Sequence, residues 1–373
     1  MLPRRYVLAG LLLVVSSGAL SFTPTWREKT TPLPERISDA DYWQLIDTLS
    51  EDGGYFRSDN FISNELTFQH VIPELKQRTP ANGVYLGVGP DQNFTYVVAL
   101  HPKIAFIVDI RRQNMLLHLL HKALIERSTD RAAFLSRLFS RPRPEGLGPE
   151  SSVQTLFEAY AQVPSSEDAF QQNLAGAIDW LVTHHGFRLS GADLRSIEYV
   201  YRAFYNGGPD LRYSFTNQFS NRWFPSYADL MQETDGQGQP RGYLATEEHF
   251  RVLKDLEQRN VLIPVVGNFA GPKAIRAVGR YLRSHGATVT AFYTSNVEFY
   301  LFQNDGWKRF FNNVATLPLD ERSTFIRSYT NNIGLGRSPG ARSTTLLDPM
   351  ADLIRDFHEG HVQTYYDLVE RSR

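Results

Sequence analysis

The chain of 373 residues contains no cysteine. This absence excludes disulfides, thiolate metal sites, iron–sulfur clusters, a cysteine nucleophile and lipoprotein processing. The sequence also lacks an excess of charge of either sign, because 39 Lys and Arg residues nearly balance 40 Asp and Glu residues, for a formal net charge of −1. No run of five or six basic residues occurs. The composition therefore predicts no nucleic-acid partner and no binding to an anionic membrane surface.

Apolar residues, by contrast, are abundant. Hydrophobic residues make up 42% of the chain and aromatic residues 13%. This content is enough for a large core, in one large domain with insertions or in two intimately packed domains.

The first residues have the pattern of a targeting segment. Arg4 and Arg5 precede an apolar run over residues 6–15, and small residues follow around Ala19. This pattern predicts a signal peptide over residues 1–21, export to the periplasm or the medium, and no membrane contact after cleavage. Because the run is too short to span a bilayer comfortably, the alternative is an uncleaved segment that tethers the protein to a membrane. Residues 22–37 contain three prolines and are expected to form a linker.

The remaining sequence, residues 38–373, alternates apolar strand-like runs with helical periodicity. Residues 38–50 are predicted to form an N-terminal helix, and a largely helical insertion is expected at about 130–245. After the last predicted strand only helices are expected, at 305–317 and 353–371. Strands separated by helices need crossover connections, which predicts an α/β fold with a mostly parallel sheet. The predicted strands are 83–89, 103–110, 260–267 and 288–294.

Two glycines follow the first predicted strand, and an acid ends the second. Gly87-x-Gly89 lies where the backbone could approach a ligand closely, and Asp109 is positioned to accept hydrogen bonds from a ribose diol. This arrangement resembles motifs I and II of the class I S-adenosylmethionine-dependent methyltransferases. The chain departs from that pattern at Tyr85, where the family usually has an acid, and at Asp91, where the third glycine is expected. From the residues alone, Asp109 could equally cap the turn before Arg111 or pair with Arg112.

The resemblance implies a Rossmann-like fold of the methyltransferase type and S-adenosylmethionine as the cofactor. It implies that Gly87, Gly89 and Asp109 bind the cofactor, with Asp91 and Asn93 at the mouth of the site. The chain is also similar to a bacterial family of exported proteins with this fold and no assigned reaction. Since S-adenosylmethionine is a cytoplasmic metabolite, an exported methyltransferase needs its cofactor loaded before export. Arg4 and Arg5 resemble a twin-arginine signal, which would permit this.

Three functions therefore stay open. The first is a methyltransferase-like protein that binds a nucleoside-type or other small polar ligand at the carboxyl edge of the sheet. The second is a binding protein without catalysis at the same edge, and the third is a hydrolase. For catalysis, Glu65, Asn268 and Tyr293 are the candidates for orienting a substrate, since Asn268 and Tyr293 lie at predicted strand ends and Glu65 lies ahead of the first strand. Glu65 belongs to a dense polar segment, residues 59–65, which could form a lid or simply cap a helix.

Two other motifs lack the context that their chemistry needs. Gly336-Arg337-Ser338-Pro339-Gly340 has the spacing of a nucleophile elbow, with Asp348 and His358 following in hydrolase order. The residues before Ser338 do not predict the buried strand that an elbow requires. His358 and His361 share a helical spacing but have no evident third ligand, so no metal is predicted.

Overall fold

The computed structural model describes residues 31–213, 224–330 and 343–372. The predicted signal peptide, part of the predicted linker and the Ser338 motif lie outside these residues. Within them, no helix has the length and apolar character needed to cross a membrane.

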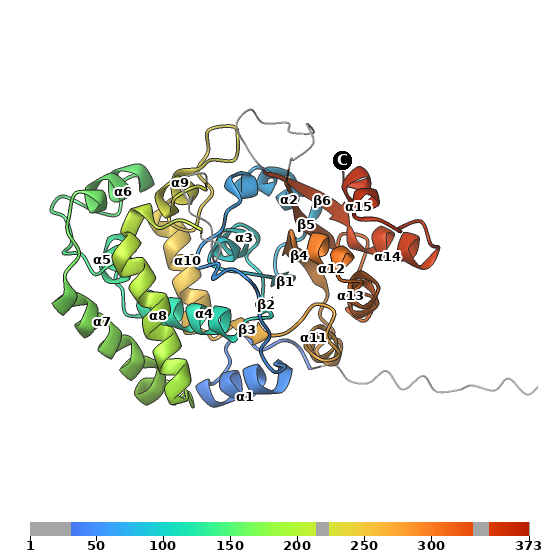
Figure 1. Cartoon of the computed structure of the whole chain (residues 1–373), viewed down its shortest axis with the longest axis horizontal. Helices are drawn as coiled ribbons and strands as arrows, with labels where there is room; N and C mark the ends of the chain where they lie inside the picture. Colours follow the sequence, from blue (N-terminus) through green and yellow to red (C-terminus); the bar gives the residue numbers. More distant parts are fainter. Residues whose placement is uncertain (1–30, 214–223, 331–342, 373) are drawn as a thin grey trace, which may run out of the picture.

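A single six-stranded sheet forms the centre of the molecule. Its strands lie in the order β3-β2-β1-β4-β5-β6, from the bottom to the top of Figure 1. Neighbouring strands from β3 to β5 are parallel, and β6 pairs antiparallel with β5. The predicted α/β class and mostly parallel sheet are confirmed. The bounds are β1 Val84–Gly87, β2 Ile104–Asp109, β3 Leu262–Val266, β4 Val289–Ser295, β5 Thr324–Thr330 and β6 Ser343–Pro349.

Strands β5 and β6 were not expected, because their residues are largely polar. The structure shows how this polarity is accommodated. Arg327 in the middle of β5 is buried and forms ion pairs with Glu298 at 2.8 Å and with Asp348 of β6 at 2.7 Å. A buried charge that is paired and hydrogen-bonded can occupy a strand that no hydrophobic pattern would reveal.

Helices cover both faces of the sheet, which explains why β1, β2 and β3 are buried along their whole length. Helix α1 begins after Ser38, whose hydroxyl accepts a hydrogen bond from the Asp41 N–H at 3.1 Å. The helix bounds are α1 Asp39–Leu49, α2 Ile72–Arg78, α3 Gln92–Leu100, α4 Arg112–Glu126, α5 Arg131–Phe139, α6 Val153–Ala161, α7 Glu167–Asp179, α8 Gly191–Gly207, α9 Tyr227–Gln232, α10 Glu247–Gln258, α11 Ala274–Ser284, α12 Val297–Gln303, α13 Trp307–Val314, α14 Met350–His358 and α15 Tyr365–Arg371. Short helical turns also occur at Leu66–Gln69, Trp180–His184 and Gly208–Asp210.

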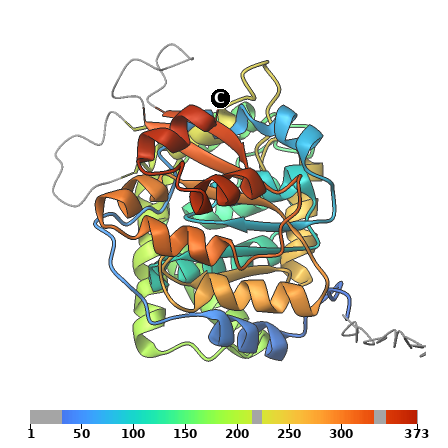
Figure 2. The ribbon, with the colours of Figure 1, turned by 90° about the vertical axis from the view of Figure 1, so that its right-hand side faces the viewer.

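The residues described between β2 and β3 form helices and loops, with a single isolated bridge between Arg212 and Ser226. Helix α4 packs on β2 and β3, and α8 packs on the outside of α4. Figure 1 shows α5, α6, α7 and α8 as an outer layer on the left, beyond α4 and α10. Figure 2 shows the opposite side, where the helices of the C-terminal part lie in front of the sheet.

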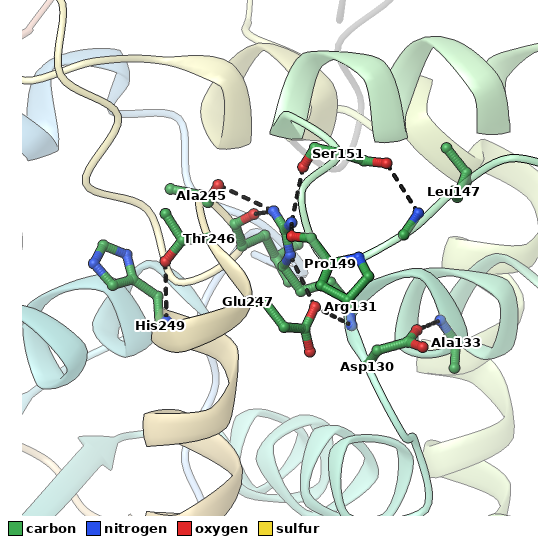
Figure 3. A network of polar contacts seen from close by, with 12 residues as sticks. Asp130, Arg131, Ala133, Leu147, Pro149, Ser151, Ala245, Thr246, Glu247 and His249 are labelled. Carbon is green, nitrogen blue, oxygen red and sulfur yellow. Dashed lines mark hydrogen bonds and ion pairs between the residues drawn. The ribbon is translucent and has the colours of Figure 1, made fainter.

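A buried arginine joins the outer helical layer to the rest of the protein. Arg131 begins α5, is 2% exposed, and forms an ion pair with Glu247 of α10 at 3.2 Å. Its guanidinium also donates to four backbone carbonyls in two loops, so all five of its N–H donors have partners (Figure 3). The four acceptors are the carbonyls of Leu244, Ala245, Pro149 and Ser151.

Candidate functional site

The strand order reverses direction at β1. The chain leaves β1 for β2 and β3 on one side, and later returns to β4 and β5 on the other. In open α/β sheets, ligands bind outside the carboxyl ends of the strands at such a reversal. A cavity of about 280 Å³ lies at this edge, close to the lower end of the range for small-molecule pockets. Its lining includes a residue at or just after the end of each of the first four strands: Gly89, Asp109, Asn268 and Ser295.

The loop after β1 has its shape because of two glycines with different constraints. Gly89 lines the cavity and has a φ of +81°, which favours glycine over any residue with a side chain. Gly87 does not line the cavity. A Cβ atom at Gly87 would lie 1.9 Å from Oδ1 of Asn93, so this glycine makes room for an internal hydrogen bond rather than for a ligand.

Asn93 fixes the glycine loop from below. Its Nδ2 donates to the carbonyls of Val88 at 2.9 Å and Pro90 at 2.7 Å, and its Oδ1 accepts from the Tyr85 hydroxyl at 2.8 Å. Tyr85, which replaces the acid of the methyltransferase pattern, therefore orients the side chain that holds the loop. Contrary to the expectation that it lies at the mouth, Asn93 is buried and does not line the cavity.

Asp91 also lies away from the cavity. Its Oδ2 accepts a hydrogen bond from the Tyr243 hydroxyl at 2.8 Å, and the side chain is 1% exposed. Burial raises the pKa of Asp91 to about 6, although hydrogen bonds from Tyr243 and Tyr227 act in the opposite direction. The expectation that Asp91 lines the mouth is thus wrong in this structure, because the side chain faces the helical layer.

Asp109 lies in the cavity wall and is paired with an arginine two residues later. Its Oδ1 accepts from the Arg111 backbone N–H at 2.8 Å and from Nε at 3.1 Å, and its Oδ2 accepts from Nη2 at 3.0 Å. Of the two alternatives to ligand binding, the cap of the turn before Arg111 is therefore observed, and the arginine that pairs with Asp109 is Arg111 rather than Arg112. Since each carboxylate oxygen has two lone pairs, Oδ2 keeps one for a ligand hydroxyl. The other neighbour, Arg112, pairs with Asp193 instead.

Arg111 links this wall to the polar segment before β1. Its Nη1 donates to the backbone carbonyls of Ser58 and Asp59. The segment passes along the cavity, and Asn60, Ser63, Asn64 and Glu65 all contribute to the lining. Tyr55 also lines the cavity and is 82% exposed.

Glu65 is the most buried acid of the lining, with 3% exposure. Its Oε2 accepts from the Tyr293 hydroxyl at 2.5 Å, and its Oε1 accepts from the Ser295 hydroxyl. Burial raises the pKa of Glu65, and the hydrogen bonds from Ser295, Tyr293 and Ser328 reduce this rise. Two of the three catalytic candidates are thus in direct contact, since Tyr293 lies behind Glu65. Tyr293 itself does not line the cavity.

The third candidate, Asn268, is exposed at the rim, just after β3. Its Oδ1 accepts from the Ala270 N–H at 2.9 Å, which closes a tight turn. Sequence reasoning missed Gln92, which lines the cavity from the start of α3, and Arg309, an exposed cation at the mouth from α13. The position of Gln92 directly after the glycine loop does not distinguish it from Asp91 and Asn93, which do not line the cavity. No local signal marks Arg309, which lies far along the chain from the other residues.

The structure describes part of the surroundings of the Ser338 motif and of the His358 and His361 pair. Asp348 is buried and paired with Arg327 and Arg371, whereas His358 is exposed. The Ser338 motif lies outside the described residues, between the antiparallel strands β5 and β6. His361 has Asp356 and Glu359 nearby, a grouping that could hold a cation, but Asp356 is already paired with Arg371.

One comparison with known proteins places the chain in a family. A family model described as a domain of unknown function, DUF7790, matches residues 60–347. The chain belongs to this family. The DUF7790 match includes every cavity-lining residue except Tyr55 and Phe56. No curated protein matches the chain.

Proposed function

We propose that this protein binds a nucleoside-type or other small polar ligand in the cavity at the carboxyl edge of the sheet. The observation that carries the proposal is the cavity itself, which brings Gly89, Asp109 and Asn268 together at the strand-order reversal. A glycine loop that permits close approach and a carboxylate with a free lone pair fit one hydroxyl of a ribose diol. The order of the first five strands agrees with the Rossmann-like arrangement that the methyltransferase resemblance implies.

S-adenosylmethionine is the first ligand to test, with methyl transfer as the reaction. If the site is catalytic, its task is to hold an acceptor atom against the methyl sulfonium, which depends on positioning more than on an acid–base pair. Glu65, which lies in the cavity wall, would orient such an acceptor, and Tyr293 and Ser295 would hold its carboxylate in place.

Calorimetric titration of the full chain with S-adenosylmethionine and S-adenosylhomocysteine tests the proposal. The matched variants are Asp109→Asn, which keeps the shape of the side chain beside Arg111, and Asp168→Asn on the exposed surface of α7. We expect micromolar binding that Asp109→Asn weakens about tenfold, the loss of about one hydrogen bond to a charged group. Asp168→Asn should bind as the wild type does.

The outcomes separate the candidate functions. Binding with methyl transfer to an added acceptor supports an enzyme, and binding without turnover supports a ligand-binding protein that uses the same cavity. No binding of either compound or of adenosine by the folded chain contradicts the nucleoside proposal. Export by residues 1–21 belongs to the same proposal, and fractionation of cells that produce the full chain tests it: recovery in the cytoplasm would contradict it.

A further inference from the structure

The polar groups behind the cavity wall form a chain in which each hydroxyl hydrogen has a defined acceptor. Tyr293 donates its hydroxyl hydrogen to Glu65 at 2.5 Å, and Ser295 donates its own to the other carboxylate oxygen. Gln92 Nε2 donates to the Tyr293 oxygen at 3.3 Å. Since the Tyr293 hydrogen is already used, Gln92 must turn its NH₂ group toward Tyr293 and its carbonyl oxygen away.

This arrangement leaves acceptors without donors. Gln92 Oε1 is buried and has no hydrogen-bond partner, although the residue lines the cavity and is 3% exposed. Asn60 Oδ1, from the polar segment that also lines the cavity, is likewise buried and unpaired. Because buried polar atoms in proteins almost always have partners, each of these oxygens calls for a donor from outside the chain.

Most buried acids of the described chain contact a cation, but Glu65 does not. Glu126 is paired with Lys122, Glu298 with Arg327, and Asp109 with Arg111. In the described part of the chain no side-chain nitrogen of Lys, Arg or His lies within 4 Å of a Glu65 carboxylate oxygen. Asp91 shares this lack, but it does not line the cavity. Burying an unpaired carboxylate is costly, and this cost falls if a cationic group enters the cavity.

We infer that the ligand of this cavity carries a primary ammonium group, or a similar cation rich in N–H donors, that binds Glu65 and Gln92. An ammonium has three donors and no acceptor, which matches a carboxylate and a free amide oxygen. The inference rests on the proposed function, since it describes the ligand of the same cavity. It adds that the ammonium group of the ligand lies against Glu65.

Two matched pairs of probes test this inference. The first pair is adenosine with a 5′-thioether chain that ends in 3-aminopropyl, and its counterpart that ends in 3-hydroxypropyl. The second pair, tyramine and tyrosol, has no nucleoside part. Affinities are measured by calorimetry for the wild type, Glu65→Gln, Gln92→Leu and Glu321→Gln. The last variant removes one carboxylate from an exposed site and controls for net charge.

We expect the wild type to bind the amine of a pair about tenfold or more tightly than the alcohol, since hydrogen bonds to charged groups are the stronger ones. Glu65→Gln should abolish this preference. Gln92→Leu, which keeps the carboxylate, should reduce it, and Glu321→Gln should leave it unchanged. If Glu65→Gln does not fold, Gln92→Leu still decides the result.

The first pair also separates this inference from the proposed function. Equal binding of the two thioethers, or a preference that survives in Glu65→Gln, would overturn the inference while the nucleoside proposal stands. If neither thioether binds, the nucleoside proposal fails and the second pair decides. Selective, Glu65-dependent binding of tyramine would then support the ammonium site, and no selectivity would refute it.

Discussion

Replacing Arg131 with lysine tests how much the buried guanidinium contributes to stability beyond its charge. Both side chains are cationic, so a lysine can also form an ion pair with Glu247. Lysine has only three donors, however, whereas Arg131 supplies five to four carbonyls and one carboxylate (Figure 3). At least two acceptors must therefore lose their partner in Arg131→Lys.

The cost can be worked out from the burial of these groups. Arg131 is 2% exposed, and Leu244 and Ala245 are also buried, so water does not easily reach their carbonyls if these lose the guanidinium; the carbonyls of Pro149 and Ser151 are only part-buried. An unsatisfied buried group costs about 1–3 kcal/mol, so loss of both buried carbonyl contacts lowers the free energy of unfolding by about 2–6 kcal/mol, and loss of the part-buried contacts lowers it by less. This is a large part of the total stability of a typical protein, about 5–15 kcal/mol.

Urea unfolding followed by circular dichroism measures the effect, with Arg143→Lys as the matched control. Arg143 lies in the same part of the chain and pairs with Asp130, but its side chain is 38% exposed. Pairs of this kind contribute about 0–1 kcal/mol, so the control should unfold almost as the wild type does. If Arg131→Lys shifts the unfolding midpoint no more than Arg143→Lys, the argument from five satisfied donors is refuted.

Two further predictions concern the glycine loop and the helical layer. Asn93→Asp removes the NH₂ group that holds the Val88 and Pro90 carbonyls, so it should lower the free energy of unfolding by about 2–4 kcal/mol and weaken ligand binding. Asn312→Asp makes the same change of charge at an exposed position of α13 and should have neither effect. Equal urea midpoints for the two variants would contradict this expectation. Burial raises the pKa of Glu257 from 4.5 to about 8, so the folded protein keeps a proton that the unfolded chain releases, and stability is lost as the pH rises through this window. The Gln side chain of Glu257→Gln does not titrate, so this variant should lose less stability than the wild type between about pH 5 and pH 8, as measured by urea unfolding. An equal loss in the two proteins would contradict the titration of Glu257 in this range.

The residues that sequence reasoning placed correctly in the cavity share one property. Gly89, Asp109 and Asn268 follow strands that periodicity predicts, and parallel strands bring their carboxyl ends to one edge. Glu65 was also found, because a dense polar segment stood just before the first strand. For these residues, chain position alone is enough to predict their neighbourhood.

The residues that were misplaced depend on contacts that no local pattern encodes. Asn93 and Asp91 follow the same glycine loop, but their side chains turn inward to Tyr85 and Tyr243, so position in the loop does not decide their direction. Strand β5 could not be predicted from hydrophobicity, because Arg327 at its centre is balanced by acids 29 and 21 residues away in the sequence. Direction and long-range pairing are properties of the folded chain.

The remaining free groups of the sheet edge argue for a ligand without a phosphate. The N-terminus of α11, a natural anion site after β3, is already occupied by Glu51, whose carboxylate accepts from the N–H groups of Lys273 at 2.8 Å and Ala274 at 2.7 Å. The cavity wall presents Glu65 and the free oxygen of Gln92, which repel an anion. Of the two arginines among the described lining residues, Arg111 is already paired with Asp109, and Arg309 at the mouth remains as a positive group for the anionic part of a ligand. A nucleoside whose substituent bears an ammonium group would donate hydrogen bonds to Glu65 and Gln92, whereas a dinucleotide would place its pyrophosphate against carboxylates.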